Sequence, residues 1–491
     1  MRNCIFHCFL FSVKVRCLLC SKELGYNNNT SSMLRHYCAL HENREETGLD
    51  EALVSMIVKD IQPFTIVDDV GFRTFVQVCD AKAKVEKVAA VSLTSDMWTS
   101  INMDAYLAVT CHFVEENEKL SSVLLGVQAF PQSHTAENIV CVKASLMEEW
   151  GISGKVTCMV TDSAPNMVAC VRELKLRHHI CVAHTLNVVV KRALDQHPVL
   201  SGLRAKARKL VGYFRSSTTA KVCSFLLLGP AMQSNGRNLL LLSEVETRWN
   251  STYLMLQHLV ELREPVGAAL AGLHTDIPFF TASEFDIVVA WLSLLSPFYD
   301  ATTELSAEEH VLVIPLLKMI EKALQEEDTK SAPAVAVEIG EQHIRQLREK
   351  LHMLQSMNIL SLATLLDPRF KLIAFFSNTK AAEAVKLWQR LDTSVMEAKR
   401  NQNVSADATV EVQRYLSEAN ISSLENPLEY WANHRSLYPN LYKLALIYLC
   451  TPASSVPCER VFSKAGEVVS KKRNPLKPKT VEKLLLRQIG S

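Results

Sequence analysis

Two apolar segments that each run into an aspartate constrain the fold of this chain more than any other feature. The segment KVAAVSLTS leads into Asp96, and the segment KVTCMVT leads into Asp162 in the same way. Both segments have the short β-branched composition of a buried strand. A single aspartate after a strand most simply opens a turn and faces water. Two such strands, if neighbours, would bring both carboxylates to one end of a sheet, as a divalent-metal site requires.

The segments around these two predict a mixed α/β domain. Residues 105–114 and 120–130 are apolar and β-branched, and residues 134–151 have the pattern of an amphipathic helix that ends at Gly151. Residues 178–194 predict a short strand that passes into a helix. Beyond residue 200 and up to about residue 425, apolar residues recur at spacings of three and four, which is typical of helices.

A second constellation near the N-terminus has the spacing of a zinc site. Cys17 and Cys20 are followed by His36 and His41, within the spacing typical of two-cysteine, two-histidine sites. A helix that begins near Thr30 or Ser31 would carry the first histidine. The alternative is a surface helix with two incidental histidines. The sequence therefore predicts one bound zinc ion here.

Composition limits the remaining function classes. The net charge is +1, so binding of nucleic acid would depend on local basic patches and not on a global field. The fourteen cysteines are scattered, which fits a reducing compartment better than a secreted disulfide framework. The first residues contain a histidine and two cysteines, and we interpret them as an irregular N-terminus and not as a signal peptide. No apolar run approaches the length of a membrane span, so no membrane partner is expected.

Several ordered motifs resemble the hAT superfamily of DNA transposases. They are TSDMWTSINMDAYLAVTCHFV, VTDSAPNMVACV, CVAHTLNVVV, EVETRWNSTYLML and the C-terminal YPNLYKLALIYLCTPASSVPCERVFSKAGEVV. The resemblance implies an RNase H-like mixed sheet interrupted by a large all-helical insertion. It also implies that Asp96, Asp162 and Glu459 form a three-carboxylate catalytic site with Mg²⁺. From the residues alone, Glu459 sits in the first turn of a helix, where the helix dipole by itself favours an acid.

The N-terminal constellation, with its TSSMLRH segment, resembles a BED-type zinc finger. The resemblances together imply five parts. They are a BED-type finger with an irregular start (1–45), a shortened helical intermediate segment (46–88), the first part of an RNase H-like domain (89–200), a helical insertion domain (201–425), and the completion of the RNase H-like domain with a hAT dimerisation region (426–491).

Further residues are expected to contact DNA. By the resemblance, Cys181 and His184 lie beside the active site and make polar contacts to the strand, although a Cys-x-x-His pair also permits a second zinc site. Arg248 and Trp249 would brace an unpaired base, and ordinary helix packing is the alternative. The basic run that begins with Lys471, Lys472 and Arg473 could contact phosphate or serve as a nuclear import signal.

The C-terminal region carries more apolar and aromatic surface than one helix pair needs. We expect this surface to form a homodimer or a higher homo-oligomer, and the alternative is that the insertion domain covers it within one chain. The residues concerned are Leu428, Trp431, Leu437, Tyr438, Leu441, Leu444, Ile447 and Tyr448.

The sequence as a whole predicts a nuclear protein that binds double-stranded DNA and derives from a hAT transposase. Its zinc finger and dimerisation region would be retained, and it could regulate transcription. The alternative is an active transposase that performs Mg²⁺-dependent DNA cleavage and strand transfer. The shortened segment before Asp96 favours the first function, and the presence of all three acids keeps the second open.

Overall fold

The computed structural model describes residues 6–8, 14–17, 23–25, 70–100, 103–220, 241–245, 248–273, 275–307, 313–326, 334–375, 377–397 and 404–471. The chain divides into two units, Met1–Gln77 and Val78–Ser491.

The first unit contains a small antiparallel sheet. Its strands are β1 (Phe6–Cys8), β2 (Lys14–Cys17) and β3 (Glu23–Gly25), in the order β1-β2-β3. Cys17, the first of the expected zinc ligands, is the last residue of β2. The ligands Cys20, His36 and His41 lie outside the described residues. The zinc finger therefore stays a prediction.

The second unit is built on a five-stranded mixed sheet, which confirms the predicted mixed α/β class. The strands are β4 (Val91–Thr99), β5 (Ala105–Val114), β6 (Leu120–Ala129), β7 (Val156–Thr161) and β8 (His178–Ile180), and their order is β6-β5-β4-β7-β8. The pairs of β4 with β5 and of β5 with β6 are antiparallel. The pairs of β4 with β7 and of β7 with β8 are parallel, as the argument from the two aspartates requires.

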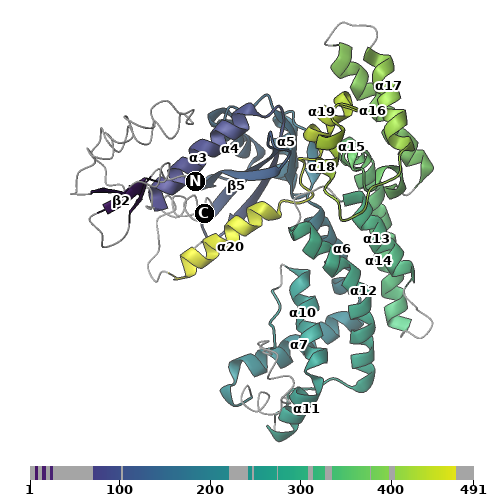
Figure 1. Ribbon diagram of the computed structural model, residues 1–491. Coiled ribbons are helices and arrows are strands. Elements are labelled where there is room, and N and C mark those ends of the chain that lie inside the picture. The colour runs from purple at the N-terminus through teal and green to yellow at the C-terminus, as the bar shows by residue number, and fades with distance from the viewer. Residues whose placement is uncertain are drawn as a thin grey trace. The chain divides into compact units, whose positions relative to one another are not determined.

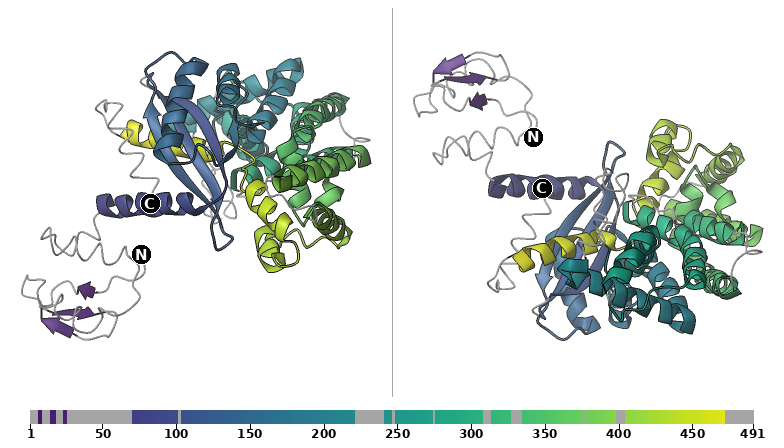
Figure 2. Two further views of the ribbon diagram at one scale, coloured as in Figure 1. Left: turned by 90° about the horizontal axis from the view of Figure 1, so that it is seen from above. Right: turned by 90° about the horizontal axis from the view of Figure 1, so that it is seen from below.

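The two faces of this sheet are covered by different parts of the chain. Side chains of the C-terminal end of α3 (Val70–Lys87), of α4 (Ala136–Glu149) and of α5 (Pro165–Glu173) pack against Leu93 and Val109 on one face. On the opposite face, Tyr106 and Ala108 contact residues of α20 (Val456–Lys471), which lies along the strands in Figures 1 and 2. Alternation of side chains along each strand thus buries both faces.

Between β8 and α20 the described residues form mostly helices. The helices are α6 (Val182–Gln196), α7 (Pro198–Ser216), α10 (Trp249–Glu261), α11 (Arg263–Gly272), α12 (Ala282–Ala307), α13 (Val313–Glu326), α14 (Ala334–Gln355), α15 (Asn358–Leu366), the 3₁₀ turn η3 (Lys371–Ala374), α16 (Asn378–Glu397), α17 (Val404–Ser417), α18 (Pro427–His434) and α19 (Pro439–Tyr448). After this excursion α20 returns to the sheet (Figure 1). Among the described helices, none is both long enough and apolar enough to cross a membrane.

The apolar surface near the C-terminus is covered within the chain, which corrects our expectation of an interface there. Trp431 and Tyr438 are fully buried, and the indole N–H of Trp431 donates to the carbonyl oxygen of Leu366 at 2.7 Å. Helix α15 packs on α19, so helical segments of the same chain cover this surface. Six of the eight residues are buried and two are partly buried against the same core: Leu428, Trp431, Tyr438, Leu441, Leu444 and Tyr448, with Leu437 and Ile447.

Candidate functional site at the acidic end of the sheet

Asp96 and Asp162 lie at matching positions on adjacent parallel strands. Thr94 pairs with Val160, and each aspartate follows two residues later. Strand β7 ends before Asp162, whereas β4 continues past Asp96 to Thr99 because it still pairs with β5. Asp96 therefore lies within its strand. The sequence analysis had placed it after the end of the strand, which is wrong. Both carboxylates nevertheless belong to the same end of the β4–β7 pair.

Backbone amides fix both aspartates locally. The N–H of Met97 donates to Oδ1 of Asp96 at 2.9 Å, and the N–H of Ala164 donates to Oδ1 of Asp162 at 3.2 Å. The second bond closes a turn just before α5, whose first residue is Pro165. Asp162 thus also has the turn-forming role that a lone aspartate after a strand would have.

Glu459 reaches this end of the sheet because the start of α20 is anchored there. The sulfur of Cys458 is fully buried and lies 3.3 Å from Oγ1 of Thr94 on β4. The backbone N–H of Ser455 contacts the sulfur of Cys181 at 3.3 Å. Glu459 follows in the first turn of α20, where the helix dipole favours a negative charge. The contact between Thr94 and Cys458, which are 364 positions apart, thereby brings Glu459 near Asp96.

Glu459 and Asp162 lie close enough to Asp96 to act on its charge. Burial, together with the charges of Glu459 and Asp162, raises the pKa of Asp96 to about 7. The hydrogen bond from Met97 acts in the opposite direction but does not outweigh these effects. Like charges gathered in a partly buried place are typical of functional sites, although structural clusters also occur. The catalytic role of Asp96, Asp162 and Glu459 that the resemblance implies stays a prediction.

A fully buried lysine, Lys143, lies near the acids, and sequence analysis did not identify it. Lys143 of α4 places its ammonium 3.5 Å from the sulfur of Met159 and 3.8 Å from the sulfur of Met167. Burial lowers its pKa, while the charges of nearby thiols and of the aspartates oppose that shift. Within the amphipathic pattern of 134–151, a lysine reads as part of the solvent face. Only the packing of α4 and α5 reveals its position.

Arg248 contacts the third acid from the helical region. Its guanidinium lies 3.7 Å from Oε2 of Glu459, and the two side chains are 61% and 40% exposed. Arg248 precedes α10 as its N-terminal cap residue. The contact connects the Arg-Trp motif with the acidic end of the sheet. A positive charge at this position could also meet a DNA phosphate.

Trp249 and Cys181 are placed differently from what a DNA contact requires. Trp249 is only 2% exposed, and its backbone N–H donates to Oδ1 of Asn187 at 3.1 Å, so the structure shows helix packing. Cys181 is fully buried and caps α6, accepting from the backbone N–H of His184 at 3.4 Å. His184 itself is partly buried in the first turn of α6. The structure brings Cys181 and His184 together as a helix cap.

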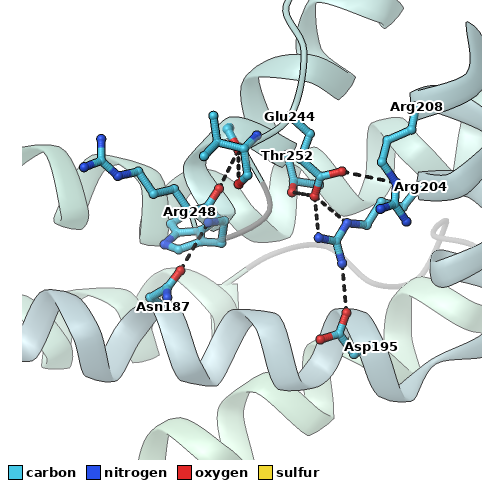
Figure 3. A network of polar contacts seen from close by, with 10 residues as sticks. Asn187, Asp195, Arg204, Arg208, Glu244, Arg248 and Thr252 are labelled. Carbon is cyan, nitrogen blue, oxygen red and sulfur yellow. Dashed lines mark hydrogen bonds and ion pairs between the residues drawn. The ribbon is translucent and has the colours of Figure 1, made fainter. Parts of the chain in front are cut away.

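A buried ion network holds the segment before the Arg-Trp motif (Figure 3). Nε of Arg204 donates to Oε1 of Glu244 at 2.6 Å, and Nη1 of Arg204 donates to Asp195 at 2.8 Å. The hydroxyl of Thr252 on α10 also donates to Glu244 at 2.6 Å. Nε of Arg208 lies 3.4 Å from the other oxygen of Glu244. Glu244 therefore links α7 to α10 and fixes the start of α10, where Arg248 lies.

The acids do not form a metal-binding group in this arrangement. Across the part of the chain that the structure describes, no three histidine, cysteine, aspartate or glutamate side chains lie close enough together to hold a metal ion. Glu459 is instead engaged by Arg248. The donor set as described does not fit Mg²⁺. Of the expected basic run, Lys471 ends α20, and Lys472 and Arg473 lie outside the described residues.

Comparison with known families agrees with this organisation. The model of the ZBED1 RNase-like domain matches residues 94–189, and that of the ZBED1 RNase-like helical domain matches residues 180–285. The model of the hAT family C-terminal dimerisation region matches residues 411–488. The first match contains Asp96 and Asp162, the second contains Arg248, and the third contains Glu459.

Similar proteins come from fungi, animals and plants. A putative transcriptional regulator, tpeD, of Talaromyces stipitatus is 23% identical over 82% of this chain and 54% of its own length. Zinc finger BED domain-containing protein 4 of Homo sapiens is 22% identical over 98% of this chain and 51% of its own length. A putative AC transposase of Zea mays is 25% identical over 80% of this chain and 56% of its own length.

The chain thus spans about half the length of these curated relatives. The relatives include both transposases and proteins named for a BED zinc finger. Together with the three successive family matches, they show that this chain is similar to hAT transposases and to zinc finger BED domain-containing proteins, and that its C-terminal part matches the hAT dimerisation region.

Proposed function

We propose that this protein is a nuclear DNA-binding protein derived from a hAT transposase, which binds double-stranded DNA and acts in transcriptional regulation. The observation that supports this most is the contact of Arg248 with Glu459. A carboxylate engaged by arginine is a poorer ligand for a cation, and an arginine at the acidic end of the sheet suits a phosphate. The protein is thus arranged to hold DNA more readily than to cut it.

The N-terminal region supplies the second DNA contact in this proposal. Cys17, Cys20, His36 and His41 bind one zinc ion, and the metal provides most of the folding energy of so small a segment. The finger binds duplex DNA, and dimerisation through the region matched at 411–488 places two fingers on one duplex. The interface uses surfaces other than the buried cluster around Trp431.

Anisotropy of a labelled duplex, titrated with the full chain, tests the DNA-binding function. We expect binding that favours selected duplexes over random ones and that weakens when Cys17→Ser removes the zinc. Equally tight binding to both duplexes would eliminate the sequence-specific part of the proposal. Stoichiometric zinc in the Cys17→Ser protein would show that the ligands are wrongly assigned.

The second candidate function is that of an active transposase that cleaves DNA and transfers strands. Its support is that burial, together with the charges of Glu459 and Asp162, raises the pKa of Asp96, as is common for carboxylates at functional sites. A nicking assay on DNA ends with Mg²⁺ or Mn²⁺, repeated with Asp96→Asn, decides between the two functions. Nicks that require Asp96 would establish the transposase, and their absence would leave the DNA-binding function.

A further inference from the structure

The outer face of α7 carries positive charge and no negative charge. The exposed positions 208, 209, 212, 215 and 216 recur at intervals that place them on one face of a helix. They are Arg208, Lys209, Gly212, Arg215 and Ser216. A solvent-facing helix usually mixes both signs of charge, but α7 contains no acidic residue at all.

This charge is concentrated and not part of a general surplus. Helices α6 and α7 together contain seven lysines or arginines and one acidic residue. The whole chain has 53 lysines and arginines against 52 aspartates and glutamates. A local excess of this kind in a nearly neutral protein produces a distinct patch of positive potential.

The fold neutralises the inward-facing cations with carboxylates, whereas Arg215 on the outer face donates to the carbonyl oxygen of Leu241 at 3.4 Å and has no carboxylate partner among the described residues. Arg204, whose side chain is 8% exposed, is matched by Glu244 and Asp195, and Lys206 is matched by Glu284 at 2.7 Å. Arg208 contacts Glu244 at 3.4 Å but keeps 46% of its side chain exposed. Of the outward-facing cations, Arg208 thus takes part in an internal ion pair, whereas Lys209 and Arg215 take part in none among the described residues.

Helix α6 connects the start of α10, where Arg248 lies, with α7. Asn187 of α6 holds the backbone next to Arg248, and Asp195 of α6 holds Arg204 one helical turn before Arg208 (Figure 3). Asn187 and Asp195 are eight positions apart, which corresponds to about 12 Å along a helix. Arg208 and Arg215 are seven positions apart, which corresponds to about 10 Å. Each interval corresponds to roughly three phosphates of one strand along the axis of a DNA duplex.

We propose that the outer face of α7, together with Arg248, is the surface on which the phosphate backbone of duplex DNA docks beside the acidic end of the sheet. Arg208, Lys209 and Arg215 contact successive phosphates. Gly212 lies between them, and nothing stands within 4 Å of the place a side chain would occupy, so a strand can approach the helix closely there. The proposal rests on the DNA-binding function and assigns it a surface separate from the zinc finger.

The salt dependence of DNA binding by the full chain tests this surface. Each phosphate contact that is lost lowers the slope of log K against log salt concentration by about 0.9. The variant Lys209→Glu/Arg215→Glu should bind a random-sequence duplex roughly tenfold or more weakly at about 0.1 M salt, with a slope reduced by about 2. Fluorescence anisotropy at several salt concentrations measures both quantities.

A matched variant controls for the change in net charge. Lys386→Glu/Arg435→Glu alters the charge by the same amount at two other exposed positions, on α16 and just after α18. It should bind like the unaltered chain. Equal weakening in both double variants, or unchanged binding in the α7 variant, would overturn the proposed surface while leaving the DNA-binding function intact. If the unaltered chain binds no duplex, the DNA-binding function and the surface both fail.

Discussion

The aromatic cluster around Trp431 and the acidic end of the sheet are both assembled from distant parts of the sequence. They differ in their buried polar groups, which are hydrogen-bonded in the cluster and carry like charges at the acidic end. In the cluster, the indole of Trp431 donates to Leu366 and the hydroxyl of Tyr415 donates to the carbonyl oxygen of Leu365 at 3.0 Å. At the acidic end, Asp96 faces two further carboxylates. The nearby Lys143 has two thioethers as its described hydrogen-bond acceptors.

The comparison shows that the aromatic cluster stabilises the fold, whereas the acidic end of the sheet lowers its stability. Satisfied hydrogen bonds and close packing stabilise the cluster, whereas gathered like charges cost stability. Sites that oppose stability in this way are retained where they serve a function. Mutations in the two regions should therefore change stability with opposite signs.

Trp431→Ala should have the largest effect. It removes a fully buried indole and leaves the carbonyl oxygen of Leu366 without its donor, so the free energy of unfolding should fall by about 3–5 kcal/mol. Urea denaturation measures this loss. Leu424→Ala is the control, because Leu424 is 95% exposed and its loss should change stability by less than about 0.5 kcal/mol. If Trp431→Ala left the free energy of unfolding unchanged but lowered the molecular mass in solution, the cluster would be an interface between two chains and not part of the core.

Asp96→Asn should stabilise the protein at pH 8. Because the pKa of Asp96 is raised to about 7, folding disfavours its charged form, and this cost grows as the pH rises from about 4 to 7. Replacement should raise the free energy of unfolding by about 2–4 kcal/mol at pH 8 and by less than half of that at pH 5. Asp286→Asn, at an exposed position of α12, should do neither. A loss of stability in Asp96→Asn at pH 8 would contradict the opposition between the two regions.

His343→Leu should weaken the sensitivity of the helical region to acid. His343 is fully buried, neither ring nitrogen has a partner among the described residues, and burial lowers its pKa to about 4. The unfolded chain binds this proton at a higher pH than the folded chain, so stability falls as the pH drops from about 6.5 to 4. Between pH 7 and 5 the variant should lose about 1–2 kcal/mol less than the unaltered chain. His352→Gln, exposed on the same helix, should behave like the unaltered chain.

Arg248→Gln should have the smallest effect on stability. Its ion pair with Glu459 is largely exposed, and such pairs contribute about 0–1 kcal/mol. Thermal unfolding should therefore be nearly unchanged, whereas DNA affinity should fall because a phosphate contact is lost. A large drop in stability would show that Arg248 belongs to the framework of the fold and not to its DNA surface.

Much of the sheet could be predicted from the sequence because each strand carries its own signal. Residues 105–114 were predicted from composition and form β5 with the same bounds. The alignment of Asp96 with Asp162 also followed from two local patterns. The extent of β4 did not, since it continues to Thr99 only because β5 pairs with it there.

The parts that could not be predicted depend on what covers a surface. The spacing of Trp431 and Tyr438 revealed an apolar face, but nothing in it indicated that α15 packs against this face in the same chain. The link between Arg204 and Glu244 joins residues 40 positions apart whose charges look solvated when read singly. Periodicity identifies a face, and only the tertiary packing identifies its partner.

The return of α20 to the sheet also orders events during synthesis. Strands β4 to β8 leave the ribosome before helices α6 to α19, and Cys458 and Glu459 emerge after those helices. Thr94 of β4 and Cys458 of α20 are separated by 364 positions. The contact that covers this face of β4 can therefore form only after most of the chain has been translated. A nascent chain arrested between α7 and α20 already contains α7 but lacks the third acid. Such a chain cannot assemble the acidic end of the sheet, which is complete only once α20 has been synthesised.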